Sequence, residues 1–135
     1  MALEINRKEH EGVTILDMKG RITVGAEATA LREAVALAAA DGIHNLVLNL
    51  AQVDFIDSTG LGAVVMCSTT MRKAGGTVKL LNLNRRNIEL LVMTKLATVF
   101  EIFTDDQDAV NSFFPDRKLN AFDILSFVQQ MKKEE

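Results

Sequence analysis

The residues whose types and spacing could do chemistry lie in one short run, residues 53–62 (VDFIDSTGLG). Two hydroxyls, Ser58 and Thr59, directly follow Asp57 and precede Gly60 and Gly62. Asp57 or Ser58 could cap a following helix by accepting hydrogen bonds from its first N–H groups. Glycine in a first helical turn costs about 1 kcal/mol relative to alanine. Its use twice indicates that a close approach is wanted there, either by the sheet or by a partner.

Other residues offer little support for catalysis. The two histidines, His10 and His44, lie in or beside predicted strands with no flanking Ser, Cys or Asp motif, so we expect surface or structural roles. Cys67 lies inside a predicted helix without a basic neighbour, which predicts an inert thiol. The Gly60-x-Gly62 pair lacks the third glycine of a dinucleotide fingerprint, and no phosphate-binding loop occurs. We therefore expect no enzyme activity, no metal and no cofactor.

Pairs of like charges have an ordinary interpretation. Asp105-Asp106 stands where a helix is expected to begin, and an acidic pair there complements the helix dipole. The basic pairs Arg72-Lys73 and Arg85-Arg86 are isolated in the sequence, so we interpret them as solvated helix ends.

Length and composition limit the class of protein. The 135 residues, 48% of them hydrophobic, suit one globular domain, and the net charge of −3 is not that of a nucleic-acid binder. A single cysteine cannot form an internal disulfide. No apolar run reaches the roughly 18–20 residues of a membrane span, and the N-terminus does not resemble a signal peptide. We therefore expect a cytoplasmic protein that binds neither nucleic acid nor membrane.

Hydrophobic spacing predicts the elements that must position residues 53–62. Alternating apolar residues with a turn at Glu11-Gly12 predict a hairpin in the first twenty residues. The rest of the chain alternates between helices and strands: helix 26–40, strand 46–50, a helix from 61 to the glycines at 75–76, strand 77–83, helix 84–95, strand 99–103 and a helix from 105. This order predicts an α/β fold with a mixed, mostly parallel sheet of four to five strands packed with helices.

The C-terminal part follows Pro115 and is expected to add one more helix. We divide the chain into a domain over residues 1–114 and a helical extension of the same domain over residues 115–135. Apolar residues in the predicted helix, residues 119–133, are Phe122, Leu125, Phe127, Val128 and Met131. Two interpretations stay open: the helix packs on the same core, or it serves self-association as a homodimer or partner docking.

The chain resembles the STAS domain family, the fold of bacterial anti-sigma factor antagonists. The most specific match is residues 55–62 (FIDSTGLG), which contain the D-S-[ST]-G-L element of the family. Further matches follow in family order across residues 3–114: 20–22 (GRI), 31–33 (LRE), 46–50 (LVLNL), 74–76 (AGG), 78–83 (VKLLNL), 94–96 (TKL), 99–103 (VFEIF) and Ala109.

The resemblance implies a single STAS-type domain that switches partners and catalyses nothing itself. In its unphosphorylated form such a protein binds an anti-sigma factor, usually a serine kinase of the GHKL type, and thereby releases a sigma factor. The kinase phosphorylates the serine of the D-S-x-G element, here Ser58 with Thr59 as the alternative, and a PP2C-type phosphatase reverses the reaction. An alternative is a STAS scaffold or adaptor in another partner-switching system that controls no sigma factor.

The resemblance also implies a partner-binding face. It includes the loop from Arg21 to Ala26 and the helix start at residues 57–62. The residues expected to bind the partner or shape its site are Arg21, Thr23, Asp57, Ser58, Thr59, Gly60, Leu61 and Gly62. Thr23 stands where many relatives carry Asp.

Overall fold

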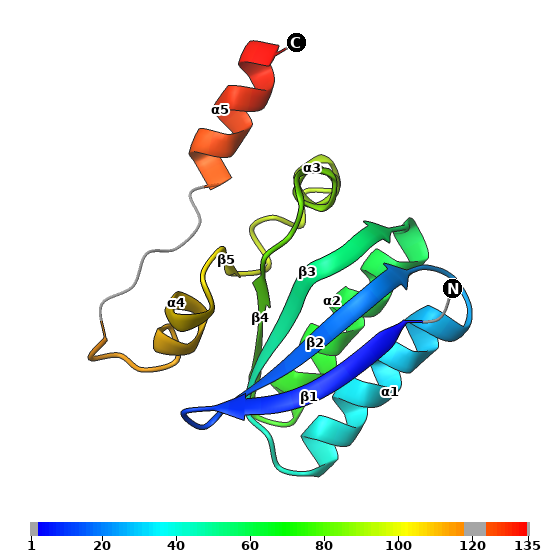
Figure 1. Cartoon of the computed structure of the whole chain (residues 1–135), viewed down its shortest axis with the longest axis vertical. Helices are drawn as coiled ribbons and strands as arrows, with labels where there is room; N and C mark the ends of the chain where they lie inside the picture. Colours follow the sequence, from blue (N-terminus) through cyan, green and yellow to red (C-terminus); the bar gives the residue numbers. More distant parts are fainter. Residues whose placement is uncertain (1–2, 118–123, 135) are drawn as a thin grey trace.

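The centre of the molecule is a five-stranded sheet in the order β1-β2-β3-β4-β5, within a computed structural model that describes residues 3–117 and 124–134 (Figure 1). The strands are β1 (Glu4–His10), β2 (Val13–Ile22), β3 (Asn45–Ile56), β4 (Thr77–Leu81) and β5 (Ile102–Phe103). β1 pairs antiparallel with β2, and all other neighbours pair in parallel. The predicted mixed, mostly parallel sheet is confirmed.

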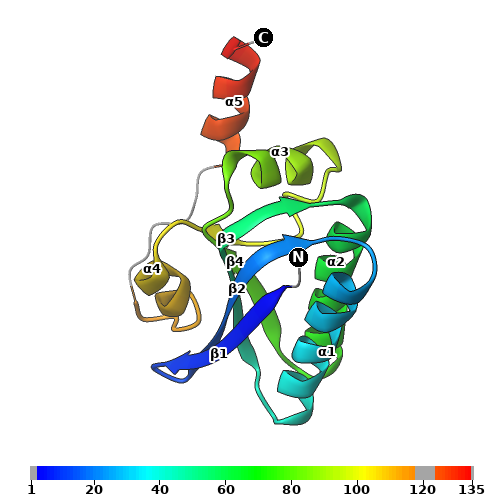
Figure 2. The same cartoon turned by 45° about the vertical axis from the view of Figure 1, so that its right-hand side comes forward.

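Helices cover both faces of the sheet, unequally. α1 (Ala26–Ala40) and α2 (Ser58–Lys73) lie side by side over one face, and the short α4 (Asp106–Asn111) lies on the opposite face (Figure 2). α3 (Arg85–Met93) lies beyond the end of β3, and α5 (Ile124–Glu134) extends outward from it (Figure 1). β1, β2 and β3 therefore keep part of one face free of helices.

The buried run of β3 shows why the sheet needs helices on both sides. Leu46, Leu48 and Leu50 belong to the large core under α1 and α2, whereas Val47 belongs to a smaller cluster under α4. Side chains alternate across a strand, so a continuous apolar run must be buried on both faces. The expected central strand is confirmed.

Several element boundaries differ from the sequence-based prediction. β3 continues from the predicted end at residue 50 to Ile56, because it stays paired with β2 up to Ile22. β4 ends at Leu81, because the next residue, Asn82, adopts a left-handed φ of 60°. β5 is limited to two residues, and Val99, expected in this strand, is 51% exposed.

The predicted hairpin turn is confirmed at Glu11 and Gly12. Their φ angles of 53° and 83° are both left-handed, as a two-residue hairpin turn requires. The adjacent residues His10 and Val13 pair with each other, which sets the register of β1 on β2.

The C-terminal helix contacts the rest of the molecule around Arg85 of α3. Ile124 and Phe127 pack against the large core, and the Arg85 guanidinium lies 5.9 Å from the Phe127 ring centroid. Leu125 is 72% exposed. This favours the interpretation that the helix packs on the same core, whereas the predicted part over residues 119–123 lies outside the described residues. The division of the chain at residues 114 and 115 stays a prediction.

Among the described residues, no helix combines the length and apolar character needed to span a membrane.

Candidate partner-binding site at the carboxyl edge of the sheet

Asp57 joins two segments at the carboxyl edge, the side of the sheet where β2 ends at Ile22 and β3 ends at Ile56. One carboxylate oxygen, Oδ1, accepts a 2.7 Å hydrogen bond from the backbone N–H of Gly60 and so caps α2. The other, Oδ2, accepts a 3.0 Å hydrogen bond from the backbone N–H of Val24 in the loop after β2. Asp57 therefore fixes both the start of α2 and the loop expected at the partner face.

Ser58 and Thr59 are the first two residues of α2, and both are exposed. Asp57, not Ser58, caps this helix, so the Ser58 hydroxyl has no capping role. In the described part of the chain, neither hydroxyl has a hydrogen-bond partner. The first N–H groups of a helix lack partners within the helix, and its dipole is positive at this end. Ser58 is therefore an accessible hydroxyl in a setting that tolerates added negative charge.

Two glycines follow, and the structure separates their roles. A Cβ on Gly60 would lie 1.8 Å from the carbonyl oxygen of Ile22, so α2 approaches β2 more closely than any side chain allows. A Cβ on Gly62 would meet nothing within 4 Å, and Gly62 is exposed. The expected close packing on the sheet is confirmed for Gly60 and wrong for Gly62. Gly62 instead leaves bare backbone on the outer surface, four residues after Ser58.

The loop after β2 presents the other expected residues beside Asp57. Arg21 is exposed, and Thr23 is half-buried while its carbonyl accepts a 3.0 Å hydrogen bond from Ala28 at the start of α1. Leu61 is 5% exposed and lies in the large core, so it supports the site from beneath. All eight residues expected at the partner face thus belong to one edge of the molecule, but only part of them reach its surface.

Sequence reasoning missed two exposed apolar side chains near Ser58. Val24 is 66% exposed, in the loop that Asp57 holds, and Met66 is 51% exposed on α2. Ser58, Gly62 and Met66 follow one another at intervals of four residues, so they lie along one face of the helix. Met66 falls outside the buried helical stripe, and that spacing was the signal in the sequence that could have identified it.

The remaining chemistry-bearing residues lie away from the start of α2 in the sequence or are buried within that helix. Burial raises the pKa of the Cys67 thiol to about 12, which keeps it protonated and inert. His10 Nε2 lies 3.0 Å from a carboxylate oxygen of Glu11, and His44 is exposed. Across residues 3–117 and 124–134, no three His, Cys, Asp or Glu side chains gather as metal ligands would.

Comparison with known proteins agrees with this geometry. The model of the STAS domain matches residues 4–109, which is most of the sequence. The chain belongs to the STAS domain family.

Curated relatives within the family carry regulatory names. The anti-sigma-B factor antagonist of Bacillus subtilis is 33% identical over 110 residues, which are 82% of this chain and 99% of that protein. The anti-sigma-F factor antagonist RsfB of Mycobacterium tuberculosis is 31% identical over 114 residues, covering 81% of this chain and 88% of that protein.

Solved structures show the same fold. A putative anti-sigma factor antagonist from Thermotoga maritima superposes with a TM-score of 0.74 at 23% identity, covering 80% of this chain and 92% of that one. The Bacillus protein SpoIIAA in its phosphorylated form superposes with a TM-score of 0.63 at 15% identity, covering 82% of this chain and 99% of that one. SpoIIAA in its unphosphorylated form superposes with a TM-score of 0.61 at 16% identity, covering 83% of this chain and 99% of that one.

Proposed function

We propose that this STAS domain is an anti-sigma factor antagonist that binds an anti-sigma factor in its unphosphorylated form and is switched off by phosphorylation of Ser58. The observation that carries the proposal is the exposed Ser58 hydroxyl at the first position of α2, beside the loop that Asp57 holds. The names of the Bacillus and Mycobacterium relatives support the choice of partner.

The partner surface of the proposal surrounds Ser58. Val24 exposes an apolar side chain in the loop held by Asp57, and Gly62 and Met66 expose bare backbone and an apolar side chain along α2 after Ser58; such surface favours contact with another protein. Asp57 fixes the loop and the helix in place before the partner arrives. Less conformational freedom is then lost on binding, and a preorganised surface binds more tightly.

A phosphate on Ser58 would act on the interface and not on the fold. It adds roughly −1.5 to −2 charges at neutral pH, at a helix end that favours negative charge. Ser58 is exposed, so the added group displaces no core side chain. At an interface the same phosphate must lose water beside the Asp57 carboxylate, and a loss of 1.4 kcal/mol is a tenfold loss of affinity. Structures of SpoIIAA in both forms, which match this fold about equally, support the view that a STAS domain keeps its fold on phosphorylation.

The proposed cycle needs two enzymes from outside the chain. The anti-sigma factor is a serine kinase of the GHKL type that transfers the phosphoryl group to Ser58, with Thr59 as the alternative acceptor. A PP2C-type phosphatase removes it. The chain itself contributes an acceptor hydroxyl and a binding surface, without catalysis or cofactor.

Affinity capture from lysate of the native cell, read by mass spectrometry, tests the proposal. The baits are the wild-type chain, Ser58→Ala, Ser58→Asp and the neighbouring control Thr59→Ala. We expect wild type, Ser58→Ala and Thr59→Ala to retain a GHKL-type anti-sigma factor, and Ser58→Asp to retain clearly less. Equal retention by all four baits would refute a switch at Ser58. Retention of one non-kinase protein by every bait would replace the sigma-factor role with that of a STAS scaffold.

A further inference from the structure

We propose that a pocket at the carboxyl ends of β2 and β3, formed by Gly20, Arg21, Asp54, Phe55 and Arg86, receives an acidic side chain of the partner protein. The inference rests on the proposed function, because the partner is the anti-sigma factor. We refer to these five residues as the Arg21–Arg86 pocket, which has a volume of about 490 Å³. Two guanidinium groups line it against one carboxylate, in a chain that is acidic as a whole.

The pocket lies on the sheet face opposite α1 and α2. Ile22 and Ile56 point into the large core under those helices. Arg21 and Phe55 precede them, pair with each other across β2 and β3, and therefore point to the other face. Phe55 is three residues before Ser58, so a partner that covers the carboxyl edge around Ser58 meets this pocket.

Hydrogen bonds hold the α3 side of the pocket in a fixed position. Asn84 caps α3 and donates from Nδ2 to the carbonyls of Val53 and Asp54 at 3.3 Å and 3.2 Å. Asn87, which is 1% exposed, donates from Nδ2 to the Val53 carbonyl at 3.2 Å. Arg86 lies between these two residues and is therefore presented from a rigid helix start.

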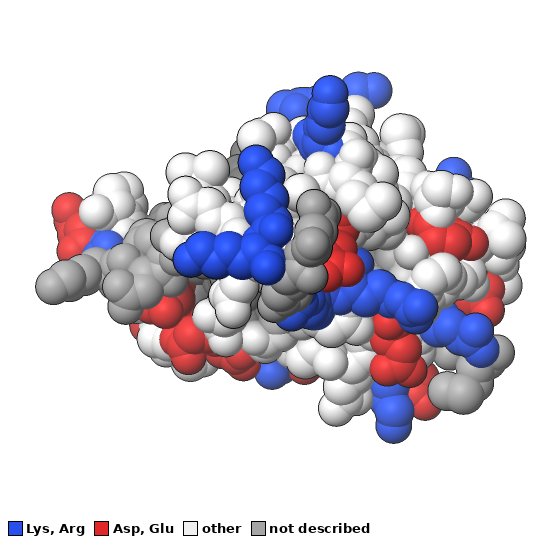
Figure 3. Space-filling model, turned by 90° about the horizontal axis from the view of Figure 1, so that it is seen from above, with Lys and Arg blue, Asp and Glu red and all other residues white. Residues whose placement is uncertain are grey.

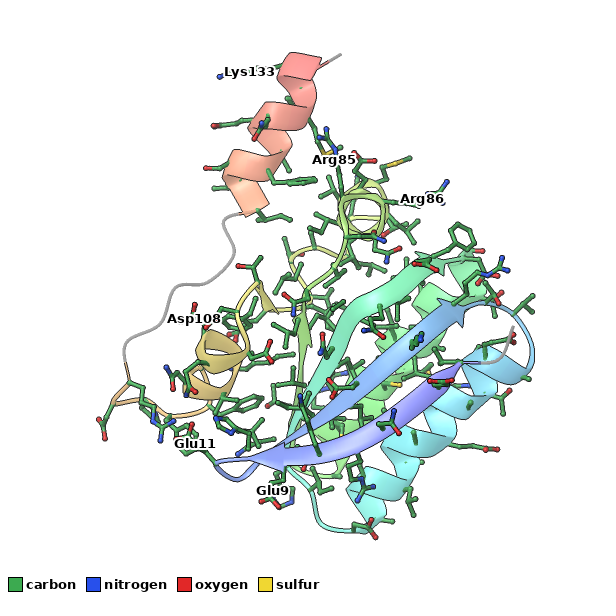
Figure 4. All side chains as sticks on the ribbon, in the orientation of Figure 1. Glu9, Glu11, Arg85, Arg86, Asp108 and Lys133 are labelled. Carbon is green, nitrogen blue, oxygen red and sulfur yellow. The ribbon has the colours of Figure 1, made fainter. Side chains whose placement is uncertain are left out.

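Arg86 points from α3 over the carboxyl end of β3, whereas Arg85 points toward α5 (Figure 4). The Arg86 guanidinium carbon lies 5.3 Å from the centroid of the Phe55 ring. Stacking on an aromatic ring holds a guanidinium in one plane and leaves its N–H groups free to donate. A carboxylate can accept two of these hydrogen bonds side by side, which a lysine could not offer.

Among the described residues, neither arginine of the pocket has an acidic partner, unlike three other arginines of the molecule. Arg7 pairs with Asp41 at 2.9 Å, Arg85 with Glu89 at 3.0 Å and Arg117 with Glu11 at 2.9 Å. In the part of the chain that the structure describes, neither Arg21 nor Arg86 forms an ion pair. Figure 3 looks down on the molecule from the side of α5 and shows Lys and Arg side chains with Asp and Glu side chains among them. Charge complementarity therefore selects an Asp or Glu of the partner as the occupant.

Calorimetry with the purified anti-sigma factor that the wild-type chain captures tests the pocket. The variants are Arg21→Glu, Arg86→Glu and the double change, with Arg72→Glu as control. Arg72 is exposed in the last turn of α2, at the far end of that helix from Ser58. We expect each pocket variant to bind at least about tenfold more weakly, with weaker salt dependence for the double change, and the control to stay within about twofold. All changed side chains are exposed, and thermal unfolding checks that each variant folds.

Unchanged affinity and salt dependence in the double variant would overturn the pocket while leaving the proposed function intact. An equal loss in Arg72→Glu would also overturn it, because the effect would then be that of overall charge. If no anti-sigma factor is captured by the wild-type chain, the proposed function fails and the pocket loses its partner with it.

Cross-linking supplies an independent readout. In the complex of the Arg86→Lys variant, a carbodiimide should join residue 86 directly to an Asp or Glu of the anti-sigma factor, identified by mass spectrometry. The matched Arg72→Lys variant should give no such link through residue 72. Absence of a link through residue 86 in a complex that still forms would contradict the proposal.

Discussion

The polar side chains at the hairpin end of the sheet are paired with one another, whereas several of those at its carboxyl edge are not. At the hairpin end, Glu11 contacts Arg117 at 2.9 Å, accepts from Gln107 Nε2 at 2.9 Å and lies 3.0 Å from His10 Nε2 (Figure 4). This network ties the turn of the hairpin to α4 and the segment after it. At the carboxyl edge, by contrast, the hydroxyls of Ser58 and Thr59 and the guanidinium groups of Arg21 and Arg86 are exposed and form no hydrogen bond or ion pair with side chains of the described residues.

We infer from this difference that the polar groups at the hairpin end stabilise the fold, whereas those at the carboxyl edge are available to bind another protein. The backbone of the carboxyl edge is nevertheless held by hydrogen bonds to the side chains of Asp57, Asn84 and Asn87. Order in the backbone combined with unpaired side chains at the surface is what a preorganised binding site requires.

Replacing Gly60 should lower the free energy of unfolding more than any other single change at the carboxyl edge. Gly60→Ala places a Cβ against the Ile22 carbonyl oxygen, so we expect a loss of about 3 kcal/mol or more of unfolding free energy. Gly62→Ala is the control, because its Cβ meets open space, and it should stabilise the helix by up to about 1 kcal/mol. Urea denaturation of both variants measures the difference. Similar stability of the two would contradict the close approach of α2 to β2.

Replacing Asp57, which holds both the helix start and the loop, should cause an intermediate loss of stability. Asp57→Ala removes the cap of α2 and the bond to the Val24 N–H, with an expected loss of about 1–2 kcal/mol. Asp57→Asn keeps an oxygen for Gly60 but cannot accept from both N–H groups, so its loss should be smaller. Urea denaturation measures stability, and hydrogen exchange of the Val24 amide reports on the loop. Slow exchange at Val24 in Asp57→Ala would show that Asp57 does not hold the loop.

Replacing Glu11 in the network at the hairpin end should change stability the least, and the change should depend on pH. Hydrogen bonds from Gln107 and then Arg117 lower the pKa of Glu11 below its ordinary value of 4.5. A lowered pKa in the folded state means that Glu11 stabilises the protein above the unfolded value and that this contribution disappears as pH falls through the folded value.

In Glu11→Gln, the midpoint of urea unfolding should therefore fall less than in the wild type as the pH is lowered from about 5 to about 3. The effect should be small because the carboxylate is exposed to water. Glu9→Gln, on the same hairpin, is the matched control. An unchanged pH profile in Glu11→Gln would show that the network contributes nothing measurable to stability.

Much of the fold could be predicted from local patterns. The positions Glu11-Gly12 predict a hairpin turn, and the apolar run at residues 46–50 predicts a strand buried on both faces. The spacing of residues 57–62 likewise predicts a capped helix start with a close approach at its glycines, which the structure has at Gly60 and not at Gly62. These features depend on neighbouring residues, whose relation the sequence shows directly.

The site needed contacts between distant segments that no local pattern shows. The bond from the Val24 N–H to Asp57 joins residues 33 positions apart. Arg85-Arg86, interpreted as a solvated helix end, is exposed as expected, but Arg86 also lies over Phe55. Hydrophobic periodicity predicts which elements form, and only the packing of those elements decides which polar side chains meet.

Installing phosphoserine at position 58 by genetic encoding tests the central claim most directly, because it places the phosphate without a kinase. Calorimetry then compares the affinity of both forms for the captured anti-sigma factor, and thermal unfolding compares their stability. We predict an affinity at least about tenfold lower for the phosphorylated form, with a melting temperature within about 2 °C of the unmodified protein. Equal affinity, or a loss of affinity accompanied by a large loss of stability, would contradict a switch that acts at the interface.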